Sequence, residues 1–129
     1  MSGPTESSSA QSPAARISNL VAQLMHAYIG RGPTKTWTTI DNNLVSVVLH
    51  DTLTRAELSL IADGREQFVR DMRKSFQQTM RKDLVDSVES VTGRKVIAFL
   101  SDNHIDPDVA IESFILDSPD GANSKAPGS

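Results

Sequence analysis

The apolar positions near the start of the chain recur at the period of an α-helix. Ser12 and Pro13 come first, and these residue types favour the N-cap and the first helical position. Gly30 and the pair Gly32-Pro33 interrupt the pattern. The spacing therefore predicts an amphipathic helix that begins near Pro13 and ends at Gly30. Its apolar stripe consists of Ile17, Leu20, Val21, Leu24, Met25 and Tyr28.

Two short runs after this helix predict a β-hairpin. Residues 34–40 are rich in β-branched and aromatic side chains, and residues 44–49 are mostly apolar on both faces. Between them, Asp41-Asn42-Asn43 is a turn signal because Asn and Asp tolerate left-handed backbone. The second run should be a central strand, since both of its faces need cover. Trp37 is expected to be buried in the first strand rather than to form a stacking platform beside Lys35.

A short helix is predicted after the hairpin. Thr54 and Glu57 have the spacing of a capping box, in which each side chain bonds the backbone amide of the other residue. The helix should run to about Ala62 and turn Leu58 and Ile61 inward.

The longest apolar pattern predicts a helix over residues 65–91, ended by Gly93. From Met72 to Val88 the apolar residues step by four, and each such step drifts by about 40° around a helix. The stripe must therefore spiral. Either the helix bends near Lys82-Asp83, or its second half packs against something that the first half does not touch, and a partner subunit is one candidate.

Two further strands are expected over residues 95–100 and 110–116, joined by the polar connection Asp102–Asp108. Strand pairs separated by helices predict an α+β fold with two layers. The expected sheet has four strands, is mainly antiparallel, and carries the N-terminal helix and the long central helix packed on it. A sheet this apolar needs that cover, and a second copy of the chain is a further candidate cover.

The two ends of the chain differ in composition from its middle. Residues 1–12 and 117–129 are rich in Ser, Gly and Pro and cannot bury enough apolar area to offset their ordering entropy. We expect both to be disordered tails around one folded domain, residues 13–116. A length of 129 residues suits one domain and not two.

Composition and charge exclude several classes of function. The chain has no cysteine, which rules out disulfides, thiolate metal sites and cysteine nucleophiles. A net charge of −3 argues against a nucleic-acid partner. No apolar run approaches the roughly 18–20 residues of a membrane span, and the first residues lack the pattern of a signal peptide. These features predict a soluble cytoplasmic protein without direct membrane insertion.

The motifs that could carry chemistry are weak. Gly30-Arg31-Gly32 follows a helix and precedes a strand, the reverse of the order in a phosphate-binding loop. The connection Asp102–Asp108 gathers three carboxylates and His104, which would suit Ca²⁺ or Mg²⁺, but it lacks the spacing of an EF-hand loop. A solvated acidic loop is the simpler interpretation, and cation binding there stays open. The sequence predicts no catalytic residue, no cofactor and no metal site.

Arg70, Lys74 and Arg81 lie on the polar side of the long predicted helix, near several acidic residues. A solvated helix face with intrahelical ion pairs is the simpler interpretation. The alternative is a binding surface for an acidic partner or for lipid headgroups.

Five short motifs, in a fixed order, identify a family resemblance. They are Gly30-Arg31-Gly32-Pro33, Leu53-Thr54-Arg55-Ala56-Glu57, Val69-Arg70-Asp71-Met72-Arg73-Lys74-Ser75-Phe76, Val91-Thr92-Gly93-Arg94-Lys95-Val96 and Glu112-Ser113-Phe114-Ile115-Leu116. Together they resemble the MpsC-like family, named after a bacterial sodium-translocating, membrane-potential-generating system. The resemblance covers about residues 14–116.

The resemblance implies a small soluble bacterial protein, associated in some members with a membrane ion or inorganic-carbon transport system. It supplies no catalytic signature. The leading hypothesis is a non-enzymatic, homodimeric accessory or regulatory domain whose partner is a membrane-transport subunit. The alternative is a small-ligand or anion sensor that uses Arg31, Lys35 and Arg73, and an enzyme of unrecognised type is a third hypothesis.

Overall fold

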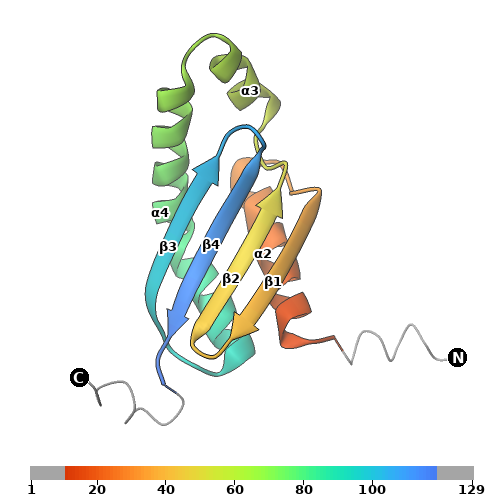
Figure 1. The fold of residues 1–129 in the computed structure, drawn as a ribbon, viewed down its shortest axis with the longest axis vertical. Coiled ribbons are helices and arrows are strands. Elements are labelled where there is room, and N and C mark those ends of the chain that lie inside the picture. The colour runs from red at the N-terminus through yellow and green to blue at the C-terminus, as the bar shows by residue number, and fades with distance from the viewer. Residues whose placement is uncertain (1–10, 119–129) are drawn as a thin grey trace, which may run out of the picture.

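Figure 1 shows the computed structural model of the protein, which describes residues 11–118. It contains three helices and one four-stranded sheet, so the predicted α+β class with a four-stranded antiparallel sheet is confirmed. Most of the two predicted tails, residues 1–12 and 117–129, lies outside the described residues.

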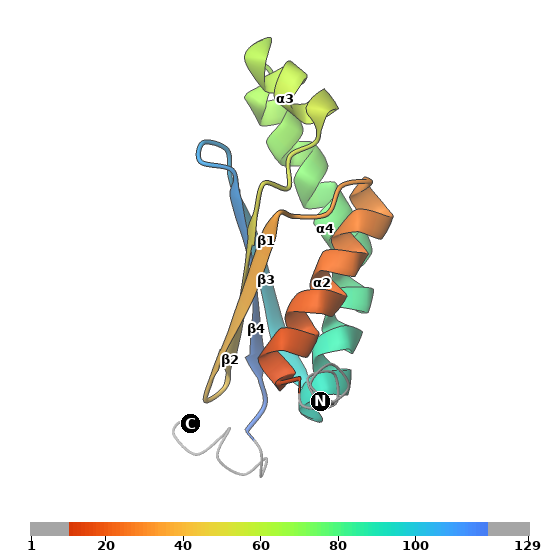
Figure 2. The same ribbon diagram turned by 90° about the vertical axis from the view of Figure 1, so that its right-hand side faces the viewer.

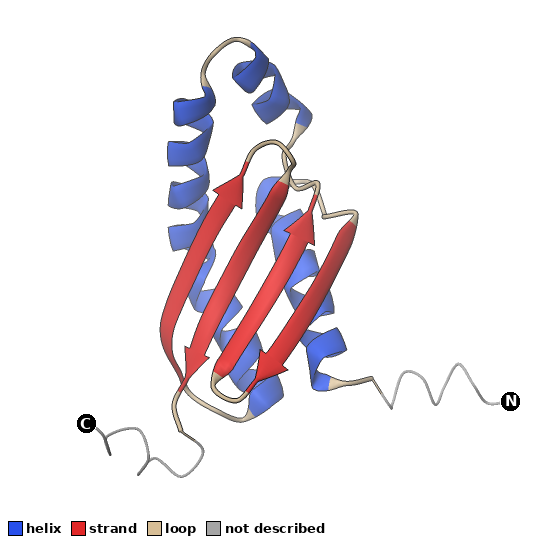
Figure 3. Cartoon of the chain, in the orientation of Figure 1, coloured by secondary structure: helices blue, strands red, loops and turns tan. Residues whose placement is uncertain are grey.

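The helices and strands follow the predicted order (Figure 3). They are α2 (Pro13–Ile29), β1 (Lys35–Asp41), β2 (Leu44–His50), α3 (Arg55–Ala62), α4 (Glu66–Thr92), β3 (Val96–His104) and β4 (Val109–Leu116). Local signals set most of their ends. The Ser12 side chain caps α2, both hydrogen bonds of the capping box form at Thr54, and Gly30 and Gly93 end α2 and α4 in the left-handed conformation.

The strands pair in the order β1-β2-β4-β3, and all three pairings are antiparallel. The prediction that β2 is central is therefore confirmed. The hairpin between β1 and β2 turns at Asn42, whose φ of 58° is the left-handed conformation expected of this residue type. Helices α2 and α4 both lie on one face of the sheet and leave the other face uncovered (Figure 2).

The hydrophobic core lies between the two helices and the sheet. The Phe99 and Phe114 rings, with centroids 5.1 Å apart, join β3 to β4 within this layer. The buried apolar residues that form this core cluster are Ile17, Val21 and Met25 of α2, Met80, Leu84 and Val88 of α4, Val45, Val47 and Leu49 of β2, and Ala110, Phe114 and Leu116 of β4.

Helix α4 has two halves with different surroundings, which explains the spiral of its apolar stripe. Its second half contributes Met80, Leu84 and Val88 to the core and packs against α2. The first turns rise past the end of α2, beside α3 (Figure 2). The buried residues there are Val69, Arg73 and Gln77, two of them polar. The second explanation offered by the sequence therefore holds, with α2 as the element that the second half touches.

Strand β3 is longer than predicted. It continues to His104, so the polar connection expected over residues 102–108 is reduced to a turn after that residue. Its last residues still pair with β4, through Asp102↔Ile111 and His104↔Val109. The apolar pattern ends at Leu100 because β3 is an edge strand whose last part faces solvent on one side and the polar half of α4 on the other.

Two side chains expected to be buried are exposed. Trp37 keeps 46% of its surface accessible because it lies on the uncovered face of the sheet, in edge strand β1. Leu58 keeps 48% accessible because α3 stands beyond the end of the sheet (Figure 1) and, among the described helices and strands, packs mainly against α4.

Candidate functional site

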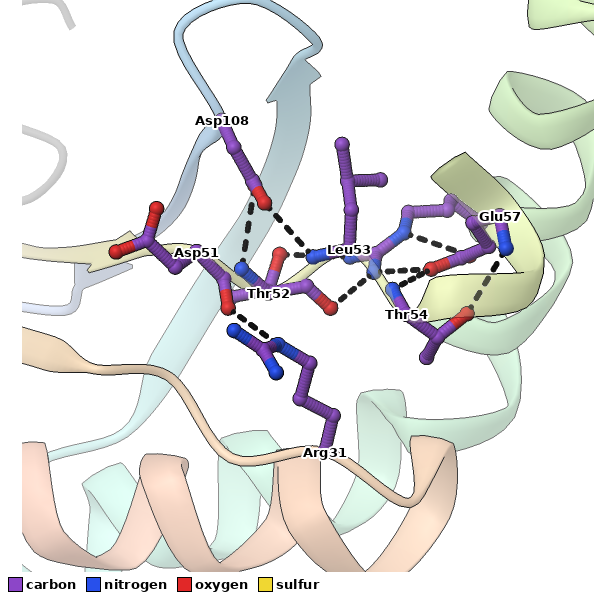
Figure 4. A network of polar contacts seen from close by, with 8 residues as sticks. Arg31, Asp51, Thr52, Leu53, Thr54, Glu57 and Asp108 are labelled. Carbon is purple, nitrogen blue, oxygen red and sulfur yellow. Dashed lines mark hydrogen bonds and ion pairs between the residues drawn. The ribbon is translucent and has the colours of Figure 1, made fainter. Parts of the chain in front are cut away.

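A buried polar cluster joins four segments of the chain at one end of the sheet (Figure 4). Its members are Thr52 in the connection from β2 to α3, Glu57 in α3, Arg73 in α4 and Asp108 in the turn before β4. The capping box at Thr54 fixes the first turn of α3 and so places the Glu57 side chain at this junction.

Arg73 is the centre of this cluster and has only 1% of its surface exposed. Its Nε and Nη2 donate to the two carboxylate oxygens of Glu57, at 3.0 and 2.7 Å. Its Nη1 donates to Thr52 Oγ1 at 2.9 Å, and Nη2 also donates to the Thr52 carbonyl at 2.6 Å. The two-pronged contact with a carboxylate is the geometry that makes arginine–carboxylate pairs strong.

The Glu57 carboxylate is stabilised in its charged form. Burial raises the pKa of Glu57, but hydrogen bonds from Arg73 and Thr54, together with the charge of Arg73, outweigh burial and hold its pKa below the usual value. The Thr54 amide donates to Glu57 Oε1 at 2.8 Å, so this one oxygen serves both the helix cap and the ion pair. The cap and the ion pair therefore depend on each other.

Asp108 has a structural role in the same cluster. Its carboxylate accepts from the amides of Thr52 and Leu53, at 3.2 and 3.0 Å, and its carbonyl accepts from the Asp51 amide at 2.9 Å. These bonds tie the turn between β3 and β4 to the connection that leads into α3. Within residues 11–118, no three Asp, Glu or His side chains gather as ligands of a metal ion.

The three residues proposed from the sequence as ligand contacts do not gather in one open site. Arg31 is exposed and donates from Nε to the Asp51 carbonyl at 2.8 Å, as Figure 4 shows. Lys35 is exposed at the start of β1, whereas Arg73 is buried and its nitrogens are bonded to Glu57 and Thr52. Arg31 bonds to Asp51 and Arg73 bonds to Thr52, and these two partners are neighbours in the connection from β2 to α3. A ligand contact by these residues stays a prediction.

Glu112 is a buried carboxyl group that sequence reasoning missed. It lies in the middle of β4 on the face that the helices cover, with no exposed surface. Within the described part of the chain, neither carboxylate oxygen has a hydrogen-bond partner of normal geometry. Burial raises the pKa of Glu112 to about 7, and the Ser101 hydroxyl and the charge of Arg73 oppose this only in part. Its alternation with Phe114 and Leu116 was a signal in the sequence that it faces the core.

A groove runs between the first half of α4 and β3, beside this buried polar layer. One section has a volume of about 270 Å³. Its lining is Gln67, Arg70, Lys74, Gln77, Ser101, Asp102 and Asn103. Arg70 Nη1 donates to the Asn103 carbonyl at 2.9 Å and so closes one end onto β3. The groove offers cationic and amide side chains to a small molecule.

The Arg73–Glu57 pair should matter more to stability than the exposed ion pair on the same helix. Arg73→Met leaves the Glu57 carboxylate buried without its cation, and we expect a loss of about 3–5 kcal/mol in the free energy of unfolding. The matched control is Lys82→Met, which removes a solvent-exposed pair with Asp86 and should cost much less stability. Urea denaturation followed by circular dichroism measures both, and equal losses would contradict the role given to Arg73.

Glu112 should make the protein less stable as the pH rises. The folded-state pKa of about 7 lies above the usual 4.5, so the folded protein holds a proton that the unfolded chain releases. This contribution is fully present below the unfolded pKa and is lost as the pH rises through the folded pKa. Its total is on the order of 3 kcal/mol.

Glu112→Gln should remove this dependence between about pH 5 and about pH 8 and should be more stable than the native protein at the upper end. Urea midpoints across that range measure it, with the exposed Asp71→Asn as the control that leaves the slope unchanged. A native slope that persists in Glu112→Gln would show that Glu112 is already ionised in the fold.

Comparison with known proteins gives a family match. A family model described as "Na+-translocating membrane potential-generating system (MpsC)" matches residues 10–118. No curated protein and no solved structure matches the chain. Among residues 11–118, none of the helices combines the length and apolar character needed to cross a membrane. Because the family match spans most of the 129 residues, this chain belongs to the MpsC family.

Proposed function

We propose that this protein is a non-enzymatic accessory or regulatory component of a bacterial Na⁺-translocating membrane system, working in the cytoplasm as a homodimer. The observation that carries the proposal is the family match over residues 10–118, because the family is described by such a system. The protein acts by holding a partner subunit through its surface rather than by transforming a substrate.

The projection formed by α3 and the start of α4 is the surface offered to the membrane partner. It extends beyond the end of the sheet (Figure 1) and exposes two large apolar side chains, Leu58 and Phe68, the latter with 58% of its surface accessible. Large exposed apolar side chains on a protruding element favour protein–protein contact. The Arg73–Glu57 pair joins α3 to α4 and gives this projection a fixed shape before a partner binds.

Co-purification from the native cells tests this function. We expect the tagged protein to recover a sodium- or proton-translocating membrane subunit from membranes solubilised in mild detergent. Phe68→Ala should lower the recovery several-fold, because it removes the largest apolar contact of the projection, whereas Gln78→Ala on the same helix should not. Recovery of no ion-translocating subunit under stringent washing would contradict the proposal.

The second candidate function is that of a small-anion sensor, and the groove between α4 and β3 favours it. Arg70 and Lys74 line this groove together with one acidic residue, Asp102, and four polar uncharged residues, Gln67, Gln77, Ser101 and Asn103. Phosphate, bicarbonate or a nucleotide bound there would be held by charge-assisted hydrogen bonds.

Thermal unfolding with each of these anions distinguishes the two functions. A ligand that binds only the folded state stabilises it by about 2.7 kcal/mol at a concentration of 100 Kd and raises the unfolding midpoint. A sensor should show this shift with one anion and lose it in Lys74→Ala, while Lys82→Ala, elsewhere on α4, keeps it. No shift with any anion would favour the accessory function.

A further inference from the structure

One whole face of the sheet carries side chains that no other element of the described chain covers (Figure 2). We call it the outer face. From β1 to β3 its rows are Lys35, His50, Val109 and His104; then Trp37, Val48, Ile111 and Asp102; then Thr39, Ser46, Ser113 and Leu100; then Asp41, Leu44, Ile115 and Ala98. Its most exposed apolar members are Leu100, at 59%, and Trp37.

We propose that the outer face is the interface of a homodimer in which the sheets of two copies pack against each other. The proposal rests on the homodimer of the proposed function and names the surface that forms it. The occupant is a second copy of this chain.

The distribution of charge on the outer face is that of an interface core with a polar rim. The outer positions of the two central strands, β2 and β4, hold no Asp, Glu, Lys or Arg. The formal charges lie on the edge strands, at Lys35 and Asp41 of β1 and Asp102 of β3. Protein interfaces likewise lose charged residues from their centre and keep them at the rim.

The outer face is also complementary to itself. A two-fold axis parallel to the strands, between β2 and β4, places Val48 of one copy over Ile111 of the other and Leu44 over Ile115. The same axis lays β1 over β3, so that Lys35 lies over His104 of the other copy and has Asp102 of that copy as its diagonal neighbour, one row away. In the two central strands apolar side chains then meet apolar ones, and at the rim Lys35 is within diagonal reach of a carboxylate while Trp37 lies over Asp102. Two twisted sheets pack in this aligned manner in β-sandwiches.

The area of the face suits a reversible dimer. Four strands about 4.8 Å apart, each about seven residues long with a rise of about 3.4 Å, span roughly 450 Å² on each copy. The two flat faces together measure roughly 900 Å². Because side chains stand out from the plane of the sheet, the accessible surface buried between them is larger, about 1,200 Å², which is the lower end for specific interfaces. The dimer should therefore dissociate on dilution.

Light scattering and sedimentation of the full chain test the interface. At a concentration on the order of 100 µM we expect a dimer, which is consistent with an interface of this size. Ile111→Glu buries a carboxylate at its centre and should weaken dimerisation by about 100-fold or more. Leu100→Glu repeats the test at a residue that is largely exposed in the monomer, where a folding defect is not expected. Phe68→Glu, an equally exposed apolar residue of α4 outside the face, should stay dimeric.

A charge exchange tests the two-fold arrangement. Lys35→Glu should weaken the dimer by about 5- to 10-fold, and adding Asp102→Lys should restore it. Lys35 and Asp102 lie on opposite edge strands of one sheet, so a rescue must act between copies.

The outcomes separate this proposal from the proposed function. A monomeric native protein would overturn both the interface and the homodimer. A native dimer that persists in Ile111→Glu and Leu100→Glu, or that is lost in Phe68→Glu, would overturn the interface and leave the homodimer standing. Loss of the membrane subunit in Ile111→Glu, with a monomeric native protein, would assign the face to that subunit instead.

Discussion

The buried ion pair between Arg73 and Glu57 is the interaction on which the upper half of the molecule depends. Helix α3 stands beyond the sheet and, within residues 11–118, packs mainly against α4, so apolar burial alone holds it weakly. Arg73 compensates for this weak apolar packing with hydrogen bonds. It bonds to Glu57 in α3 and to Thr52 in the connection from β2 to α3. Asp108 extends the same cluster to the turn between β3 and β4. One guanidinium therefore fixes the projection relative to the sheet.

The molecule has an apolar half and a polar half along α4. The lower half packs Met80, Leu84 and Val88 against α2 and the sheet, which is an ordinary hydrophobic core. The upper half packs Arg73 and Gln77 over β3 and β4, where neither carboxylate oxygen of the buried Glu112 has a hydrogen-bond partner of normal geometry among the described residues. A buried carboxyl group in this position lowers stability when it is charged. The polar half is thus where stability depends most on proton concentration.

The two faces of the sheet have different surroundings, because α2 and α4 cover only one of them (Figure 2). The covered face supplies the core, and the uncovered face keeps Trp37, Leu100 and Ile111 accessible. A four-stranded sheet with two helices on one face is stable as a single layer pair, so the second face is free to take a partner. The projection formed by α3 and the start of α4 lies at one end of the sheet (Figure 1), apart from the uncovered face.

The sequence by itself determined the elements and most of their ends, the end of β3 excepted, because caps and turns are local chemistry. The Ser12 cap, the Thr54 capping box, the Asn42 turn and the final glycines of α2 and α4 all lie within a few residues of the atoms that they bond. The family resemblance and the α+β class also followed from the order of these signals. The central position of β2 followed from its two apolar faces.

Only the tertiary structure decided which polar residues are buried and which apolar ones are exposed. Arg73 and Glu57 are 16 residues apart, and Glu112 is buried because the helices cover the face of the sheet on which it lies. Tryptophan in a strand is usually buried, yet Trp37 lies on the face that none of the described helices covers. The physical reason is that burial depends on the elements that pack against a residue, and the periodicity of one segment contains no information about its neighbours.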